Sequence, residues 1–278
     1  MIHLDQIGRQ FFPQYRVLKR EELDSTNRLA RQLADQGEPE GILVVAERQT
    51  AGKGRRRKTW FSLPGKSLTF SMLFRPEHKL PEQGPQLSLM LGLSLAQVLE
   101  SMGFTPRLRW PNDVLLQGKK VAGILIESSV QAGRLRWVVA GIGINLGLER
   151  DDFPSELRLT ATSLLIEGKK PVSSEVFLSE FLPVLSSWYF SWKENRDQRR
   201  MLEEYEKRSA VLGKTVNFKL GGWTVRGRAD TIDENGGLWV TTGEGKIRLS
   251  WGEVSMTVES PHPGEGSGWR EAETGNRP

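Results

Sequence analysis

Five short apolar runs in the N-terminal part of the chain limit its fold more strongly than any other feature. They span residues 42–46, 68–74, 114–116, 121–126 and 138–146 and are rich in Val, Ile and Leu. Short apolar runs bounded by turn-forming residues are typical of β-strands, and helical patterns lie between them. The sequence therefore predicts a mixed β-sheet flanked by helices over residues 1–208.

Two longer segments predict helices that can cover this sheet. Residues 87–102 fit both a strand alternation and a helical spacing, and their length together with a glycine at their end favours a helix. A second helix is expected from about Ser174, with an apolar face that extends to Trp192. Pro183 should kink or divide it, because proline cannot donate a backbone hydrogen bond. A charged helical segment through Tyr205 follows.

After Arg208 the pattern changes to short alternating strands separated by turn signals. This pattern predicts a small SH3-like β-barrel over residues 209–258. Residues 259–278 are rich in Gly, Pro, Ser and Glu and have almost nothing to bury, which predicts a disordered tail. The expected fold class is thus α+β, a mixed sheet with helices followed by a small barrel. The expected barrel strands are residues 215–220, 224–229, 238–241 and 246–251.

The composition excludes several kinds of chemistry. The 278 residues include no Cys, which excludes disulfides, thiolate metal sites and cysteine-dependent acyl transferases. The three His residues lie too far apart in the sequence to predict a ligand cluster. No apolar run approaches the roughly 20 residues of a membrane span, and the first residues lack a signal-peptide pattern. We therefore expect a cytoplasmic protein with no membrane partner.

A glycine-rich basic stretch follows the first apolar run and indicates an anionic ligand. Five cationic side chains occupy the six positions from Lys53 to Lys58, around Gly52 and Gly54. Glycine lets backbone N–H groups approach a ligand closely, and crowded cations repel one another unless an anion neutralises them. A solvated basic loop and a nucleic-acid patch are alternatives from the charge run alone. The net charge of only +5 makes the basicity local and weakens the nucleic-acid interpretation.

Two other glycine-containing stretches look like nucleotide motifs but fail in detail. Residues 64–67 end like a Walker A loop, but Trp60 stands where that motif needs its first glycine. Residues 141–146 begin like a dinucleotide fingerprint, but Leu146 occupies the third glycine position inside an apolar strand. Neither a P-loop nor a Rossmann site is predicted.

Six short motifs occur in the order found in one enzyme family. They are Asp24-Ser25-Thr26-Asn27, Glu47 to Trp60, Arg109-Trp110-Pro111-Asn112-Asp113, Lys120 to Glu127, Gly141 to Leu146, and Ala161-Thr162-Ser163-Leu164. Each is weak alone, but with the C-terminal β-region they cover nearly all of residues 20–257. On these motifs the chain resembles the biotin protein ligases, which attach biotin to carboxylase carrier domains. The family fold is a class II synthetase-like mixed sheet with a C-terminal SH3-like barrel, in agreement with the prediction above.

Several features depart from the usual family pattern. In the family's Gly-Arg-Gly-Arg-Arg-Gly loop, Lys53 replaces the first arginine and Arg57 replaces the last glycine. Arg57 reaches a positive φ less easily than glycine, so we expect the ordered form of the loop to differ there. Arg109 stands where lysine is common. Only 24 residues precede Ser25, which is typical of a ligase without an N-terminal DNA-binding domain, so no DNA partner is expected.

The resemblance implies a two-step reaction that uses biotin and ATP. Biotin carboxylate attacks the α-phosphate of ATP, pyrophosphate leaves, and biotinyl-5′-AMP is held until a carrier lysine attacks its carbonyl. The expected partner is the biotin carboxyl carrier domain of acetyl-CoA carboxylase or of another biotin-dependent carboxylase. Because an anion must approach a polyanion, Mg²⁺ and cationic side chains at the α-phosphate are expected. A homodimer through an exposed sheet edge is left open.

The resemblance also implies roles for individual residues. Lys120 ranks first as the catalytic cation, because it can touch both the biotin carboxylate and the α-phosphate. Arg55 and Asp113 complete the catalytic set, and Asp113 is the candidate Mg²⁺ ligand. The expected biotin-binding residues are Ser25, Thr26, Asn27, Gln49, Gly52, Lys53, Gly54, Arg55, Lys120 and Gly123. The expected ATP-binding residues are Arg55, Arg56, Trp60, Asn112, Lys120, Asn145, Thr162 and Ser163.

Purely structural alternatives exist for the main candidates. Lys120 can be one of two adjacent surface lysines in a turn, and Ser25 can be a helix N-cap. Trp60 can be a buried core residue, and Asp113 can form a turn with its neighbour. The glycines of the strands can serve packing alone. Two other classes of protein also stay open, namely a lipoate-attaching ligase of the same general fold and a non-enzymatic nucleic-acid binder.

Overall fold

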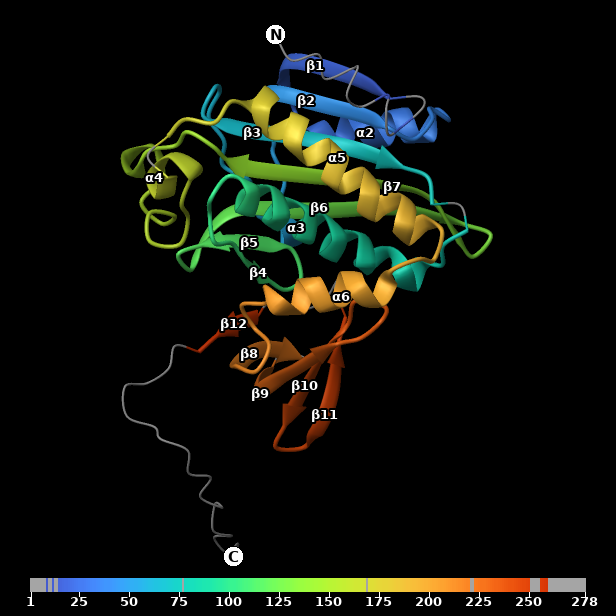
Figure 1. Ribbon diagram of the computed structural model, residues 1–278, viewed down its shortest axis with the longest axis vertical. Helices are drawn as coiled ribbons and strands as arrows, with labels where there is room; N and C mark the ends of the chain where they lie inside the picture. The colour runs from blue at the N-terminus through green and yellow to red at the C-terminus, as the bar shows by residue number, and fades with distance from the viewer. Residues whose placement is uncertain are drawn as a thin grey trace, which may run out of the picture.

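A seven-stranded mixed sheet forms the centre of the computed structural model, which describes residues 9, 12, 15–76, 78–168, 170–220, 223–250 and 256–259 (Figure 1). The strand order is β1-β2-β3-β7-β6-β5-β4. β1 and β2 run parallel, and the other neighbouring pairs of this sheet are antiparallel. The strands are β1 (Arg16–Leu23), β2 (Ile42–Gln49), β3 (Ser67–Phe74), β4 (Arg107–Arg109), β5 (Asp113–Leu116), β6 (Lys119–Gln131) and β7 (Arg134–Asn145).

Helices cover the two faces of this sheet unequally. α3 (Gly84–Ser101) and α5 (Ser174–Lys193) lie over one face and enclose the main apolar core (Figure 1). α2 (Thr26–Asp35) packs on the other face against β2, β3 and β7, where it covers a smaller apolar cluster. One face is thus broadly covered, whereas the other has room for a site beside α2. The remaining helices are α4 (Leu164–Gly168) and α6 (Gln198–Lys207), with 3₁₀ turns η1 (Arg55–Arg57), η2 (Pro81–Gln83) and η3 (Arg150–Asp152).

A second, antiparallel sheet of five strands follows α6. Its order is β11-β10-β9-β8-β12. The predicted C-terminal β-domain is confirmed as an antiparallel sheet, and among the described residues no pairing joins β11 to β12. The strands are β8 (Thr215–Leu220), β9 (Trp223–Ile232), β10 (Leu238–Thr242), β11 (Gly245–Leu249) and β12 (Met256–Val258).

Most predicted elements are confirmed, and the differences have physical reasons. The sequence does not predict β1, an edge strand with mostly exposed polar side chains, or β4, which has only three residues. α5 runs unbroken through Pro183, because buried apolar side chains on both sides of the proline hold one helix face in the core. Of the kink or division predicted at Pro183, the division is therefore wrong. The boundary at residue 208 stays a prediction, and residues 260–278 of the predicted tail lie outside the described residues.

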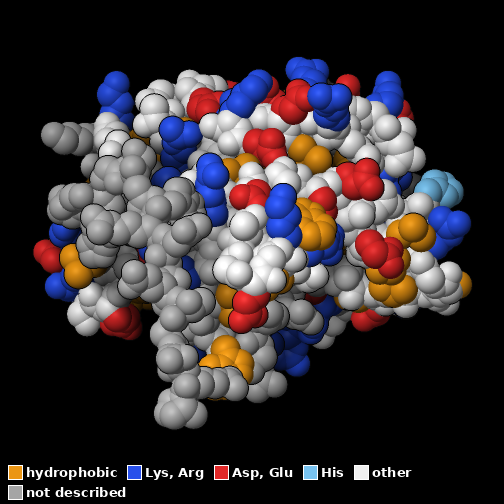
Figure 2. All heavy atoms as spheres, turned by 90° about the horizontal axis from the view of Figure 1, so that it is seen from below, with side chains coloured by type: hydrophobic (Ala, Val, Ile, Leu, Met, Phe, Trp, Pro, Cys, Tyr) orange, Lys and Arg blue, Asp and Glu red, His pale blue; other side chains and the backbone are white. Residues whose placement is uncertain are grey.

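The helices and the surface charges are relevant to two possible kinds of partner, a membrane and a nucleic acid. No helix within the described ranges is long and apolar enough to cross a membrane. Figure 2 shows Lys and Arg interspersed with Asp and Glu on the face seen from below Figure 1. In the C-terminal sheet, Arg226 pairs with Glu259 and Arg248 pairs with Asp233. The described part of that face therefore does not form the positively charged patch that binds the phosphate backbone of a nucleic acid.

One turn of the C-terminal sheet reaches the central domain. Trp110, which is buried, donates a hydrogen bond from Nε1 to the carbonyl of Gly236 at 3.0 Å. The Asp233 carboxylate shapes this turn by accepting hydrogen bonds from the backbone nitrogens of Asn235 and Gly237. The turn thereby supports the segment between β4 and β5, which carries Asn112.

Candidate functional site

The floor of the site is one face of four adjacent strands. Thr69 of β3 pairs with Gly143 of β7, Gly143 pairs with Gly123 of β6, and Gly123 pairs with Asp113 of β5. Directly paired residues of antiparallel strands share a face, so these four residues form a row across the sheet. A second row joins Ser71, Gly141 and Leu125. Small and polar residues therefore lie where β-strands of a core usually carry branched apolar side chains.

Three of these glycines make room for side chains of the site. A Cβ added at Gly141 would lie 2.1 Å from Asn27 Oδ1, and one at Gly143 would lie 2.2 Å from Trp60 Cε2. A Cβ at Gly123 would lie 2.8 Å from Lys120 Nζ and 3.1 Å from Trp60 Cζ3. Their backbones also line the cavity, and the close ligand approach predicted for Gly123 and Gly141 stays a prediction.

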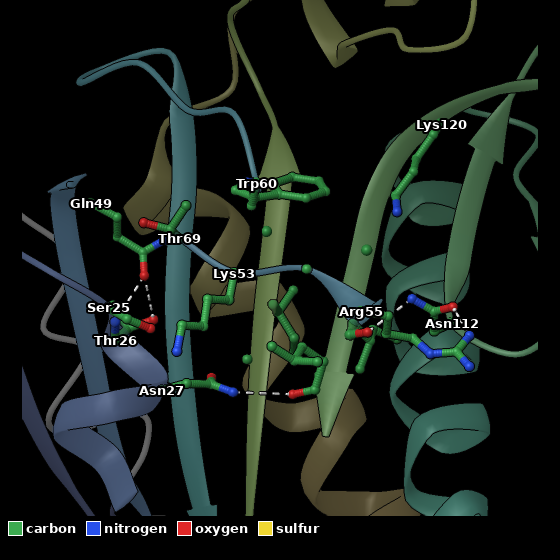
Figure 3. Close-up of a pocket in the computed structure, with 17 residues that line it drawn as sticks. Ser25, Thr26, Asn27, Gln49, Lys53, Arg55, Trp60, Thr69, Asn112 and Lys120 are labelled. Carbon is green, nitrogen blue, oxygen red and sulfur yellow. Dashed lines mark hydrogen bonds between the residues drawn. The ribbon is translucent and has the colours of Figure 1, made fainter. Parts of the chain in front are cut away.

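A cavity of about 440 Å³, including its open mouth, lies above this floor. Figure 3 shows Ser25, Thr26 and Gln49 on one side of it and Arg55, Asn112 and Lys120 on the other, with Lys53 between. The two ends of the cavity therefore differ in charge. The full lining is Ser25, Thr26, Asn27, Gln49, Lys53, Gly54, Arg55, Trp60, Thr69, Asn112, Lys120, Gly123, Ile124, Leu125, Gly141, Ile142 and Gly143.

The first end carries uncharged hydrogen-bonding groups held by their neighbours. Gln49 Oε1 accepts a hydrogen bond from the backbone nitrogen of Thr26 at 2.8 Å. Ser71 Oγ lies 2.7 Å from Thr26 Oγ1 and 2.6 Å from Asn27 Oδ1. Ser25 occupies the N-cap position of α2, but its side chain makes no capping hydrogen bond. The predicted N-cap position is thus right, and the hydroxyl is not used for capping.

The second end carries cations around one carboxylate. Lys120 Nζ lies 2.5 Å from Asp113 Oδ1, and Arg109 Nη2 lies 2.7 Å from Asp113 Oδ2. Burial raises the pKa of Asp113, but Lys120 and Arg109 outweigh this effect and hold the pKa below its ordinary value. Arg55 donates a hydrogen bond to Asn112 Oδ1 at 2.9 Å. Burial lowers the pKa of the Arg55 guanidinium, and Asp113 partly offsets this.

Lys120 is held in a strand, not in a turn. Its backbone nitrogen donates to the carbonyl of Thr160 at 2.8 Å, and its carbonyl accepts from the nitrogen of Thr162 at 2.9 Å. The Nζ atom lies 5.4 Å from the ring centroid of Trp60, within cation–π distance. Its side chain is 29% exposed, so the ammonium lies between the buried carboxylate and the cavity.

The basic loop folds back on itself above the floor. Lys53 and Thr59 form an antiparallel bridge, and Gly54 N donates to the Lys58 carbonyl at 2.7 Å. Arg56 has φ 57°, whereas Arg57 does not adopt a positive φ. The positive φ of this loop thus falls on Arg56, and the predicted difference in the ordered form of the loop stays a prediction.

Trp60 ends this loop and covers part of the floor. Its ring lies over Gly143 and Gly123, and it is half-buried at the cavity. Its Nε1 is buried with no hydrogen-bond partner among the residues that the structure describes, which is unusual for an indole in a core. A polar ligand atom placed there would satisfy it.

The residues around Asp113 do not form a metal site by themselves. Within the described ranges, no group of three or more His, Asp or Glu side chains comes together as metal ligands would. Both carboxylate oxygens of Asp113 already face cations. Mg²⁺ is usually held by one or two carboxylates together with substrate phosphates, so a lone ion-paired carboxylate does not fit a resident ion. Asp113 as a Mg²⁺ ligand stays a prediction.

The structure brings together most of the predicted site residues and leaves six outside the cavity lining. Asn145 donates to the carbonyl of Thr162 at 2.9 Å, and Ser163 bonds to the carbonyl of Leu148, so these side chains hold the segment beside Lys120. The roles predicted for the six in ligand binding stay predictions. The six are Gly52, Arg56, Asp113, Asn145, Thr162 and Ser163.

Sequence reasoning missed the polar residues of β3 and the acid of β6 that contacts Asn27. Thr69 and Ser71 alternate with Phe70 and Met72 in β3, and this alternation was the available signal. Glu127 accepts a hydrogen bond from Asn27 Nδ2 at 2.7 Å, a contact between residues far apart in the sequence. Contacts of this kind depend on where α2 crosses the sheet.

Comparisons with known proteins agree with this geometry. Residues 20–145 match the biotin/lipoate A/B protein ligase family, and residues 211–257 match the biotin protein ligase C-terminal domain. The bifunctional ligase/repressor BirA of Bacillus spizizenii is 34% identical over 235 residues, which cover 84% of this chain and 72% of the relative. The biotin--[acetyl-CoA-carboxylase] ligase of Mycobacterium tuberculosis is 31% identical over 236 residues, which cover 83% and 85%. The structure of biotin protein ligase from Aquifex aeolicus in complex with biotin and ATP is similar with TM-score 0.74 and 32% identity, covering 87% of this chain and 99% of that one.

Proposed function

The chain belongs to the biotin protein ligases, and from that membership we propose that it activates biotin with ATP and transfers it to a carrier lysine. In the first step a carboxylate oxygen of biotin bonds to the α-phosphorus, and pyrophosphate leaves. In the second step the lysine amine bonds to the biotin carbonyl, AMP leaves, and the amine loses a proton. The proposed acceptor is the biotin carboxyl carrier domain of acetyl-CoA carboxylase or of another biotin-dependent carboxylase.

The difference between the two ends of the cavity carries this proposal. Biotin has an uncharged cyclic urea at one end and a carboxylate at the other. The hydroxyl and amide groups of Thr26 and Gln49 suit the urea, because they offer uncharged donors and acceptors. The ammonium of Lys120 and the guanidinium of Arg55 suit the carboxylate and the phosphate that it attacks.

Lys120 is assigned the central role in the first step. Charge accumulates on the α-phosphate oxygens as the carboxylate approaches, and a fixed cation in a partly buried site stabilises that charge more strongly than water does. The ion pair of Lys120 with Asp113 fixes the position of the ammonium before the substrates react. Arg109 also pairs with Asp113, so this carboxylate neutralises Lys120 only in part. The ammonium can therefore still attract the anionic substrates.

The basic loop is assigned the role of a cover over the adenylate. An acyl-adenylate hydrolyses when water reaches it, so a loop that closes over it both protects and retains the intermediate. At the charged end of the cavity Arg55 donates a hydrogen bond to Asn112. This contact joins the loop to the segment between β4 and β5. Mg²⁺ enters this proposal only with the substrate, as the magnesium complex of ATP.

Pyrophosphate release tests the first step directly. The protein should release pyrophosphate from ATP when biotin is present, and it should then label a purified carrier domain with biotin. Lipoate is the control ligand, because its dithiolane ring lacks the N–H and C=O groups that Thr26 and Gln49 would pair. Equal pyrophosphate release with lipoate and biotin would contradict the assignment of biotin. Binding of nucleic acid that falls steeply with salt and does not depend on biotin would favour the nucleic-acid alternative.

A further inference from the structure

We propose that Ser71 determines which ring atoms the cavity accepts, by fixing the direction of the hydroxyl proton of Thr26. Ser71 is completely buried beneath the uncharged end and does not line the cavity. This inference rests on the proposed function, because it concerns how the same cavity recognises the urea of biotin.

The orientation of the Asn27 amide is the first step. Asn27 Nδ2 lies 2.7 Å from Glu127 Oε2 and 3.4 Å from the carbonyl of Leu125. Both neighbours only accept hydrogen bonds, so the NH₂ group of the amide must face them. Arg31 donates to Glu127 Oε1 at 2.8 Å and holds this carboxylate in place. The oxygen of the Asn27 amide therefore faces Ser71.

The directions of two hydroxyl protons then follow by elimination. Asn27 Oδ1 cannot donate, so the proton in its 2.6 Å contact with Ser71 belongs to Ser71. A serine hydroxyl has one proton, so the proton in the 2.7 Å contact between Ser71 and Thr26 must come from Thr26. Thr26 thus donates its hydroxyl proton to Ser71 and can only accept hydrogen bonds from other groups. Towards the cavity Thr26 is a fixed acceptor.

Gln49 supplies the complementary donor. Its Oε1 atom accepts from the backbone nitrogen of Thr26 at 2.8 Å, so its NH₂ group points elsewhere. That nitrogen lies on the side of Gly52, where an added Cβ would be 3.3 Å away. Gln49 and Thr26 both line the cavity, so this pair of side chains offers one donor beside one acceptor. A cyclic urea offers the matching C=O acceptor beside an N–H donor.

Ser71 acts in this scheme as a positioning residue. Without its hydroxyl, Thr26 can turn its proton into the cavity or towards Gln49 Oε1, which lies 3.2 Å away. Thr26 would then accept or donate according to the ligand. Removal of the Ser71 hydroxyl should therefore weaken the discrimination between ligands more than it weakens binding. Thr26 can still form a hydrogen bond with the ligand, either as donor or as acceptor.

Paired titrations with biotin and one analogue test the inference. The analogue is a cyclic carbamate in which the ring N–H that faces Thr26 is replaced by oxygen, so that it offers an acceptor where biotin offers a donor. Isothermal titration should show that the wild-type protein prefers biotin by roughly 30-fold, because two acceptors would face each other in the carbamate complex. Ser71→Ala should reduce this ratio to about 3-fold, mainly through tighter binding of the carbamate.

Ser94→Ala is the matched control. Ser94 is also completely buried, but among the described residues its hydroxyl bonds only to the Met90 carbonyl within α3. This variant loses a buried hydroxyl of the same kind and should keep the wild-type ratio. A thermal melt of both variants reports any general loss of stability, which a merely structural role for Ser71 would produce without a change in the ratio.

Glu127→Gln is the second variant, in case Ser71→Ala does not fold. A glutamine amide can donate as well as accept, so Asn27 is free to turn its NH₂ group towards Ser71. The proton directions along Asn27, Ser71 and Thr26 would then reverse, and the ratio should fall as well.

The outcomes separate the inference from the proposed function. A ratio that stays at the wild-type value in folded Ser71→Ala or in folded Glu127→Gln overturns the role of Ser71. A wild-type protein that binds neither ligand overturns the proposed function, and this inference with it. A reduced ratio in both variants with an unchanged ratio in Ser94→Ala supports the inference.

Discussion

The two faces of the central sheet use the same strands for opposite purposes. Towards α3 and α5, β3 presents Phe70 and Met72, and β7 presents Ile142, all of them buried in the main core. Towards the cavity the same strands present Ser71 and Gly143, residues with little or no side chain. Alternation along a strand sends neighbouring residues to opposite faces, so packing and chemistry are separated by one residue.

This difference shows how the site obtains both space and rigidity. The covered face supplies the apolar burial that holds the strands in register. The open face can then contain glycines, which contribute little to stability but leave room for Asn27, Trp60 and Lys120. Substitutions on the cavity face should therefore change binding and catalysis, whereas substitutions on the covered face should change stability.

Lys120→Ala should give the largest effect on the cavity side. Loss of the only lysine paired with Asp113 among the described residues removes the fixed cation that we propose acts at the α-phosphate, and it should reduce adenylate formation by about 10³-fold. Pyrophosphate release with biotin and ATP measures this rate. Lys119→Ala is the matched control, because Lys119 is the adjacent lysine of β6 and does not line the cavity. Near-normal release by Lys120→Ala would remove Lys120 from its assigned role.

Gly143→Ala should give the next largest effect. The added methyl would lie 2.2 Å from Trp60 Cε2 and must displace the ring, which should weaken biotin binding by roughly 10- to 100-fold. Gly147→Ala places its methyl at an ordinary 3.7 Å from the nearest atom and should bind biotin normally. Isothermal titration of both variants distinguishes a specific clash from a general effect of alanine in this segment.

Arg55→Gly should loosen the cover on the same face. Without the hydrogen bond from Arg55 to Asn112, the loop should retain biotinyl-AMP less well and release it about 10-fold faster. Labelling of bystander lysines by the released adenylate measures the leak. A variant that labels only the carrier domain and releases no adenylate would show that the loop is not the cover.

Phe70→Leu tests the covered face with a smaller effect. Phe70 is completely buried and packs edge-on against Phe181 of α5, with ring centroids 5.7 Å apart. The substitution should reduce the free energy of unfolding by about 1 kcal/mol and leave the rate per folded molecule unchanged. Chemical denaturation and pyrophosphate release measure the two quantities. A large loss of activity at unchanged stability would contradict the separation of the two faces.

The pH dependence of stability should show the smallest effect. Lys120 and Arg109 lower the pKa of Asp113 in the folded protein. Its ionised form therefore stabilises the fold above the ordinary pKa of an aspartate, and this contribution is lost as pH falls through the folded pKa. Denaturant unfolding from about pH 6 to about pH 3 should show a decline that Asp113→Asn reduces. An equal decline in both proteins would assign the acid sensitivity to other carboxylates.

Much of the site could be predicted because its residues lie in contiguous motifs. Ser25, Thr26 and Gln49 line the cavity as expected, and so do Arg55 and Lys120. Of the residues that were missed, Ser71 lies outside the six motifs, and Glu127 ends one of them without an expected role. Ser71 and Glu127 become important only through contacts with α2, and nothing local to either residue signals those contacts.

The sequence by itself determined the strand alternation, the position of the basic loop and the set of chemical groups available. The tertiary structure alone decided which face of the sheet became the site. Strand register pairs Gly143 with Thr69 and with Gly123, and α2 crosses only part of that face, so the cavity opens where the glycines align. The tertiary structure also determines the directions of the hydroxyl protons that we infer for Thr26 and Ser71. These directions depend on Asn27 and Glu127, which only the fold brings together.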